Sequence, residues 1–396
     1  MTTKRLGILI LAIAGMMLAG ISSTSGSSGI ASLHRDDSPA KSEKFGDPST
    51  VATLPEKTRK QADLKNRSNN PSLNGPYRTI TDMAGRRVLI PKTISKVLGT
   101  SPPFTRLVYV LAPDKLGGWI GSLSEENAKF IPRKYRDKPV FRWSQKPINY
   151  EAYIAARPDI VFVGGGTGID LSMVNLIQEK LGTIPVVCVD NTTNAVGYAE
   201  GIRFMGNVLG VPDRAEELIT YYQNVLNEIQ TKIAAIPDKK RVRVYYAEGN
   251  NGLSTDPRGS MHSQLIEVCG GVNVAACRLT SGSGMTPVTI ESVLMWKPDV
   301  IIARSREFTT QVYNDATWKK IPAVRNHRVH LVPTQPFNWF DRPPGVNRIV
   351  GIPWTAHLFY PGLFPKDWLR MKVKKFYSIY YHYELSDGDL RSLLNE

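Results

Sequence analysis

The chain has 396 residues, 42% of them apolar and 21% charged, so it can bury the cores of two ordinary domains and is not broadly disordered. Lys and Arg outnumber Asp and Glu by 50 to 35, a formal net charge of +15. Three cysteines and six histidines are too few for a Cys/His metal cluster or a dense disulfide scaffold. The mean hydropathy of −0.22 argues against a polytopic membrane protein.

Residues 1–22 have the pattern of a secretory signal peptide. Lys4 and Arg5 precede an apolar run over 6–19, and small residues follow it. The run is short for a membrane span, which needs about 20 residues, but its retention as an uncleaved anchor stays open. Ile21 stands where a lipoprotein signal would carry cysteine. We therefore expect a protein that is exported to the periplasm, or otherwise beyond the cytoplasmic membrane, and is not lipidated.

A polar stretch over 23–76 shows no sustained apolar period, which predicts a flexible linker. Basic residues still exceed acidic ones in the body that follows, so the positive charge is not confined to a tail. Nucleic acid is one partner of a basic protein, but an exported protein rarely meets it. We therefore expect no nucleic-acid partner and an anionic small ligand instead.

The body begins with a hairpin signal around 79–90, followed by a strand at 96–99 and a helix at 105–111. β-Branched runs then predict strands at 160–163 and 186–189, and strands that alternate with helices indicate a parallel sheet. Helices are expected over 199–209 and, from its apolar spacing, 214–236, before a new strand at 241–246. The expected divisions are an N-terminal α/β lobe over 77–195, an interlobe helical segment over 196–240 and a C-terminal α/β lobe over 241–396.

An internal repeat supports this organisation. Residues 151–163 and 291–303 share a glutamate at the start, a basic residue before Pro-Asp, and an apolar run at the end. Each copy reads as a helix, a Pro-Asp turn and a buried strand. Because the copies lie on either side of the predicted long helix, they indicate a duplicated, two-lobed α/β protein.

At these residues the sequence resembles the substrate-binding protein of an ABC importer, in the class that binds chelated iron, haem or cobalamin. The resemblance covers about Thr79 to the C-terminus. It rests on the order of four features: residues 81–86, the two Pro-Asp repeats, residues 262–273 and residues 338–344. A Tyr-rich tail over 376–385 is similar to that of iron- and haem-type binders.

The resemblance implies two Rossmann-like α/β lobes joined by a single long helix, with the ligand cleft between the lobes. It also implies that the protein is a monomer with no permanently bound cofactor and that it captures a metal chelate. A ferric siderophore or haem is the preferred ligand, and cobalamin or a nickel chelate is the alternative. The chelate is then delivered to an ABC permease dimer in the cytoplasmic membrane. In similar proteins one glutamate per lobe meets arginines of the permease, which here implies Glu151 and Glu291. Stabilisation of a helix dipole by these two carboxylates stays open.

Ligands of two-lobed α/β proteins lie at the carboxyl ends of the strands. Flat aromatic faces suit a macrocycle or catecholate, and arginine forks hold carboxylate or phenolate oxygens. Each of these side chains can instead fill a core or pair locally. The candidate ligand-binding residues at these ends are Phe104, Arg142, Trp143, Tyr246, Arg304, Trp339 and Arg342.

Other chemistry finds little support in the sequence. The histidines are scattered without ligand spacing, so no metal site of the protein itself is predicted, and His262 reads as a structural or cleft-rim residue. There is no Gly-x-Ser-x-Gly elbow or His-Glu-x-x-His pair, so we expect no enzyme. A secreted α/β hydrolase and a structural surface protein remain the alternatives. Cys269 and Cys277 can form a disulfide or remain free thiols, and the sequence does not favour either alternative.

Overall fold

The computed structural model describes residues 75–142, 148–164, 169–190, 192–280 and 284–396. The described residues all belong to one compact unit. Its strands are β1 (Tyr77–Thr81), β2 (Arg87–Pro91), β3 (Val97–Gly99), β4 (Trp119–Ile120), β5 (Val140–Phe141), β6 (Ile160–Val163), β7 (Val186–Cys188), β8 (Arg243–Ala247), β9 (Ser254–Thr255), β10 (Val272–Asn273), β11 (Thr286–Pro287), β12 (Val300–Ala303) and β13 (Val329–Leu331). Its helices are α2 (Pro102–Leu111), α3 (Glu125–Ala128), α4 (Arg133–Arg136), α5 (Tyr150–Ala156), α6 (Leu171–Leu181), α7 (Tyr198–Leu209), α8 (Pro212–Ile233), α9 (Gln264–Val268), α10 (Ile290–Trp296), α11 (Arg306–Gln311), α12 (Pro322–Arg325), α13 (Arg348–Phe359), α14 (Lys366–Tyr381) and α15 (Asp387–Leu394).

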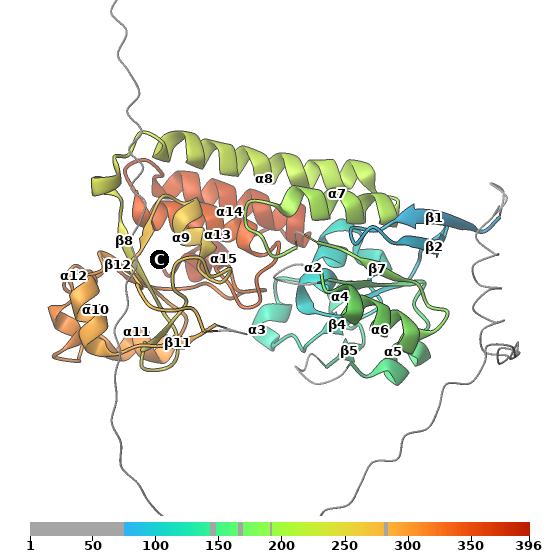
Figure 1. The fold of residues 1–396 in the computed structure, drawn as a ribbon. Coiled ribbons are helices and arrows are strands. Elements are labelled where there is room, and N and C mark those ends of the chain that lie inside the picture. The colour runs from blue at the N-terminus through green and yellow to red at the C-terminus, as the bar shows by residue number, and fades with distance from the viewer. Residues whose placement is uncertain (1–74, 143–147, 165–168, 191, 281–283) are drawn as a thin grey trace, which may run out of the picture. The chain divides into compact units, whose positions relative to one another are not determined.

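The two largest sheets are parallel, as the alternation of strands and helices predicted. The first sheet has the order β3-β6-β7 and the second the order β10-β8-β12-β13, and every pairing in them is parallel. In addition, β4 and β5 form a short parallel pair, and β1 with β2 and β9 with β11 form antiparallel pairs. The helices α7 and α8 lie between the two sheets in the chain and beside one another in space (Figure 1). The expected long helix at 214–236 is α8, which begins two residues earlier because Pro212 suits a first helical turn.

The internal repeat is confirmed residue by residue. The helices α5 and α10 end at Arg157 and Lys297, which have left-handed φ angles of 48° and 45°. A Pro-Asp turn then leads into β6 in one copy and β12 in the other. In both copies the aspartate carboxylate accepts a hydrogen bond from the backbone at the start of a neighbouring strand. Asp159 accepts from N of Lys96, just before β3, at 2.8 Å, and Asp299 accepts from N of Arg243, the first residue of β8, at 3.0 Å. The Pro-Asp motif therefore joins each helix to its sheet.

Alternation along the strands divides the core into three clusters. In β6, Phe162 faces a large central cluster while Val161 faces a smaller one under α6. In β8, Tyr246 faces the same central cluster while Tyr245 faces a third cluster under α10 and α11. The central cluster thus touches both sheets, and this shared core explains why the described residues form one compact unit.

The helix α14, which precedes the last helix α15, is a second link between the parts built on the two sheets. It packs along α8, and it also contacts α2 of the first sheet (Figure 1). The Tyr109 hydroxyl of α2 donates to the Tyr381 carbonyl, and the Tyr380 hydroxyl donates to the Leu218 carbonyl of α8 at 2.7 Å. The expectation of a single joining helix is therefore incomplete, because the Tyr-rich tail folds back across the junction.

The motif at residues 81–86 is structural. The buried carboxylate of Asp82 accepts from the backbone of Arg86 at 2.9 Å and from Cys188 N of β7 at 3.1 Å, and it also forms an ion pair with the Arg86 guanidinium. The hairpin of β1 and β2 is therefore anchored to the first sheet.

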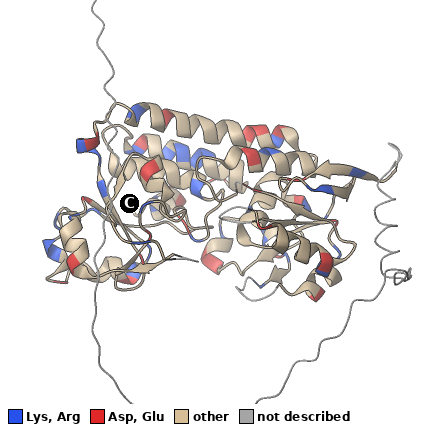
Figure 2. Ribbon diagram, in the orientation of Figure 1, with Lys and Arg blue, Asp and Glu red and all other residues tan. Residues whose placement is uncertain are grey.

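Charged side chains are spread over the outer helices (Figure 2). On α14, Lys372 pairs with Glu228 at 2.8 Å and Lys374 with Asp387 at 2.7 Å, so part of the basic charge is already neutralised. Among the described residues, none of the helices combines the length and the hydropathy that a membrane crossing requires.

Candidate functional site

A cavity of about 290 Å³ lies where segments that follow the two sheets meet. One side comes from α2 and from the segment around β4, and the other from Arg304 after β12 and from the loop before α13. This is the expected place, because strand ends of two α/β units converge there. The residues that line the cavity are Thr105, Arg106, Trp119, Ile120, Gly121, Ser122, Leu123, Asn127, Arg304, Thr334, Pro336, Phe337, Asn338 and Arg342.

Two arginines face this cavity from opposite sides, and neither forms an ion pair with a described carboxylate. Arg106 on α2 donates to Asn347 Oδ1 at 3.0 Å and lies over the Phe337 ring, 4.4 Å from its centroid. Burial lowers the pKa of Arg106 to about 10, so the guanidinium stays charged at neutral pH. Arg304 is exposed, and its Nη1 lies 3.8 Å from Met285 Sδ. Both cations are therefore available to a ligand.

Arg342 lines the cavity as predicted, but its charge is already engaged. Its Nε lies 2.5 Å from Glu248 Oε1 and 3.3 Å from Asp341 Oδ2, and its Nη2 lies 2.5 Å from Asp256 Oδ2. Burial alone would lower the pKa of Arg342, but the bond to Glu248 and the nearby carboxylates raise it above its ordinary value. Burial raises the pKa of Glu248 to about 8, although the Arg342 bonds oppose this shift.

Two of the predicted aromatic faces are core residues. Tyr246 and Trp339 are both 0% exposed. Tyr246 packs against Phe340, with 4.8 Å between ring centroids and 50° between ring planes. Burial, followed by the charges of Asp341 and Glu248, holds the pKa of Tyr246 well above its ordinary value. Trp339 donates its indole N–H to Gln335 O at 3.2 Å. The expectation that these rings present flat faces to a ligand is therefore wrong, and Trp119 and Phe337 line the cavity instead.

The remaining predicted ligand-binding residues do not line this cavity either. Phe104 is 2% exposed and belongs to the central core beside Gly164, while its neighbours Thr105 and Arg106 face the cavity. Arg142 is exposed at the end of β5. Trp143 lies outside the described residues.

The two repeat glutamates are equivalent in the structure. Glu151 and Glu291 both lie in the first turn of their helices, α5 and α10, and both are exposed. Each N-terminus is capped by another residue, by Asn149 through Ala152 N at 3.1 Å and by Thr289 in the second copy. The capping hydrogen bonds therefore do not involve Glu151 or Glu291, whose exposed carboxylates lie where they can still stabilise the helix dipoles.

No disulfide joins Cys269 and Cys277, and the described cysteines are all free. The Cys269 thiol is buried behind α9 and donates to the Ile352 carbonyl of α13 at 3.3 Å. Cys277 is only half-buried and lies under α10 and α11. The two thiols therefore point into different surroundings.

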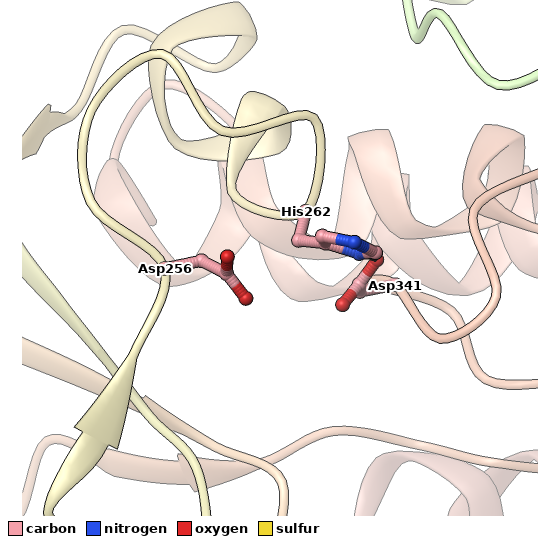
Figure 3. A group of neighbouring side chains, drawn as sticks. All are labelled: Asp256, His262 and Asp341. Carbon is pink, nitrogen blue, oxygen red and sulfur yellow. Dashed lines mark hydrogen bonds and ion pairs between the residues drawn. The ribbon is translucent and has the colours of Figure 1, made fainter. Parts of the chain in front are cut away.

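Sequence reasoning missed Arg106 and a buried polar cluster behind Arg342. Arg106 lies in the first turns of the helix that follows a strand end, and ligands gather at the carboxyl ends of strands. The sequence nevertheless predicted only a helix at Arg106. In the cluster, Asp256, His262 and Asp341 place ligand-type atoms within 4.8 Å of one another (Figure 3). Each comes from a different loop, so no local spacing in the sequence announces a group that could hold a metal ion.

Residues 113–336, more than half of the chain, match the family model described as periplasmic binding protein. An ABC transporter solute binding protein from Sulfurospirillum deleyianum has a similar structure, with a TM-score of 0.74 and 32% identity, covering 81% of this chain and 99% of that one.

Two further relatives have named ligands. The molybdate-binding protein MolA of Haemophilus influenzae is 25% identical over 331 residues, which is 77% of this chain and 91% of that protein. A vitamin B12-binding protein of Salmonella typhimurium is 28% identical over 213 residues, 53% of this chain and 73% of that protein. The similarity thus extends over most of the body.

Proposed function

Because the chain belongs to the periplasmic binding protein family, we propose that its cavity captures an anionic metal species for import. The family consists of non-enzymatic solute-binding proteins of ABC transporters, so the predictions of a binding protein and of no enzyme are confirmed. The secreted hydrolase is excluded by the same finding. The identity of the metal species is the part that we propose.

The pair of arginines that faces the cavity carries the proposal. Arg106 and Arg304 lie on opposite sides, and the described lining residues include no Asp or Glu. A cationic ligand would meet uncompensated positive charge, whereas an anion gains charge-assisted hydrogen bonds from both sides. Neutral donors such as Asn127 and Ser122 complete a polar lining that suits oxygen atoms.

The size and lining of the cavity favour a compact oxyanion such as molybdate. Its volume of about 290 Å³ is at the small end for ligand sites, which span roughly 300–1,000 Å³. The 25% identity to a molybdate-binding protein supports this choice. A metal chelate, as the sequence predicted, is the second candidate, because Trp119 and Phe337 supply aromatic lining for a ferric siderophore or haem.

Two lobes, one built on each sheet, are proposed to hold the ligand between them, and the exposed glutamates are proposed to meet the permease. One carboxylate per repeat, Glu151 and Glu291, supplies one contact for each subunit of a two-subunit permease. This arrangement rests on the repeat and on family resemblance. Membership of the periplasmic binding protein family supports a location beyond the cytoplasmic membrane. The signal peptide at 1–22, the lack of lipidation and the linker at 23–76 stay predictions, because residues 1–74 lie outside the described residues.

Calorimetric titration of the full chain tests the proposal. The ligands are molybdate, an anionic ferric siderophore, haem, cyanocobalamin and a cationic metal amine complex as the control. We expect molybdate to bind and the cationic complex to fail. Replacement of Arg106 by methionine removes a charge-assisted bond of about 1.5–3 kcal/mol and should weaken binding by about 10- to 150-fold.

Arg142→Met is the matched control, because Arg142 is exposed and does not line the cavity. It should bind every ligand as the wild type does. If Arg106→Met and Arg304→Met both keep wild-type affinity for all anions that bind, the cavity is not the ligand site. If only haem or the siderophore binds, the chelate replaces the oxyanion.

A further inference from the structure

A second cavity, of about 460 Å³, adjoins the ligand cavity. Arg304 and Thr334 belong to the walls of both cavities, so the two meet just beyond the carboxyl ends of β12 and β13. The rest of the second wall comes from α3, from the start of α11 and from the end of α15. A solute can therefore pass from one cavity to the other beside Arg304.

The second cavity is the outer one of the two. Its wall includes the exposed side chains of Glu126, Arg306 and Ser392. The wall of the ligand cavity includes instead the buried rings of Trp119 and Phe337, which are 2% and 6% exposed. A solute that enters through the outer cavity thus moves from solvent toward a more buried site.

Arg306, the first residue of α11, has a guanidinium that the fold does not use. Its backbone carbonyl accepts hydrogen bonds from the hydroxyls of Thr309 and Thr310, at 2.8 and 3.0 Å. Within the part of the chain that the structure describes, its side chain forms no hydrogen bond or ion pair. The donors of Arg306 therefore remain available to a solute, and its charge can be removed without breaking a contact of the fold.

The balance of charge favours movement of an anion from the outer cavity to the ligand cavity. In the outer cavity the carboxylate of Glu126 offsets one of the two arginines, which leaves one unbalanced positive charge. In the ligand cavity Arg106 and Arg304 face no carboxylate of the described lining, so two positive charges are unbalanced there. Solvent also screens charges less in the more buried cavity. An anion is therefore attracted to the outer cavity and held more strongly in the inner one.

We propose that Arg306 and Arg304 form an outer anion site through which small oxyanions reach the ligand cavity. This site rests on the proposed function, because it lies on the route to the same cavity. Clefts lined by charge of one sign raise the association rates of oppositely charged solutes by about 10- to 1,000-fold. Arg304 contacts both cavities, whereas Arg306 lines only the outer one of the two. Arg306 therefore acts on the rate of binding more than on the affinity.

Stopped-flow mixing of the full chain with molybdate tests the site, with tryptophan fluorescence as the signal because Trp119 lines the ligand cavity. At low ionic strength Arg306→Gln should lower the association rate constant by about three- to tenfold. The dissociation rate constant should fall by a similar factor, because the anion leaves by the same route. Added salt should reduce the difference from the wild type, since it screens exposed charges.

Two variants are the controls. Arg306→Lys keeps the positive charge and should associate at nearly the wild-type rate, because attraction over a distance depends on charge and not on the shape of the donor group. Arg325→Gln removes an exposed arginine of α12 that lines neither cavity, so it changes the net charge by the same amount. It should also associate at the wild-type rate.

The outer anion site is wrong if Arg306→Gln associates as fast as the wild type, or if Arg325→Gln slows association equally. It is also wrong if Arg306→Gln only speeds dissociation, since Arg306 would then hold the bound anion. Equilibrium titration separates these results from the proposed function. Molybdate binding with an unchanged association rate ends only the outer site, whereas a wild type that binds no molybdate ends the oxyanion function and the outer site together.

Discussion

Gly351 is the position where a single methyl group should disturb both the fold and the cavity. It lies within α13, and a Cβ atom there would stand 1.8 Å from the carbonyl oxygen of Trp339 and 2.8 Å from its carbonyl carbon. Both atoms belong to the backbone, so no side-chain rotation relieves the overlap. The Gly351→Ala variant must therefore push the segment around Trp339 away from α13.

The magnitude follows from two opposing effects. Alanine stabilises a helix interior by about 1 kcal/mol relative to glycine. Overpacking a core costs about 1–3 kcal/mol and more where backbone must move, and here the overlap exceeds about 1 Å. We expect a net loss of about 2 kcal/mol in the free energy of unfolding. Because Asn338 and Arg342 lie on the displaced segment and line the cavity, anion affinity should fall as well.

Urea unfolding of the full chain measures the loss. The control is Gly388→Ala in α15, where the nearest atom to the added Cβ is Ser386 Oγ at 3.7 Å. That variant should be as stable as the wild type or more stable by up to about 1 kcal/mol. If Gly351→Ala unfolds at the wild-type urea concentration, or if both variants lose the same stability, the packing of α13 against Trp339 is not as described.

Replacing Glu151 and Glu291 together by alanine should abolish uptake through the partner permease and leave ligand affinity unchanged; normal uptake by a folded, exported variant would reduce the two carboxylates to helix stabilisers. Because α8 and α14 both span the junction of the two parts, X-ray scattering should detect little compaction when ligand is added, and marked compaction would contradict this. Tyr109→Phe leaves the buried Tyr381 carbonyl without its hydrogen-bond donor, so the free energy of unfolding in a urea titration should fall by about 1–3 kcal/mol. An unchanged free energy of unfolding would contradict this. Burial, with the charges of nearby basic groups, lowers the pKa of His330 from 6.5 to about 4, so between these pH values His330 is protonated only in the unfolded state. The free energy of unfolding should therefore fall by at most about 3 kcal/mol as the pH drops from 6.5 to 4. In the His330→Gln variant this pH dependence should be weaker.

The sequence by itself determined the elements and their order. β-Branched runs placed β6 and β7, apolar residues at helical spacing placed α8, and the Pro-Asp repeat identified two equivalent helix–turn–strand units. These features depend on residues that are close together in the sequence, because the apolar periodicity and the turn-forming residues of a short segment determine its secondary structure. Arg304 and Arg342 were found for the same reason, since strand ends can be recognised locally and ligands gather there.

Only the tertiary structure decided which of these side chains face the ligand cavity. Tyr246 and Trp339 were predicted as ligand faces, yet they are buried because the central core reaches both sheets and α14. Arg106 was missed because its role depends on an opposing loop more than two hundred residues away. The grouping of Asp256, His262 and Asp341 likewise results from three loops that meet behind Arg342. Burial and long-range contacts are properties of the packed chain, and no local spacing of residues encodes them.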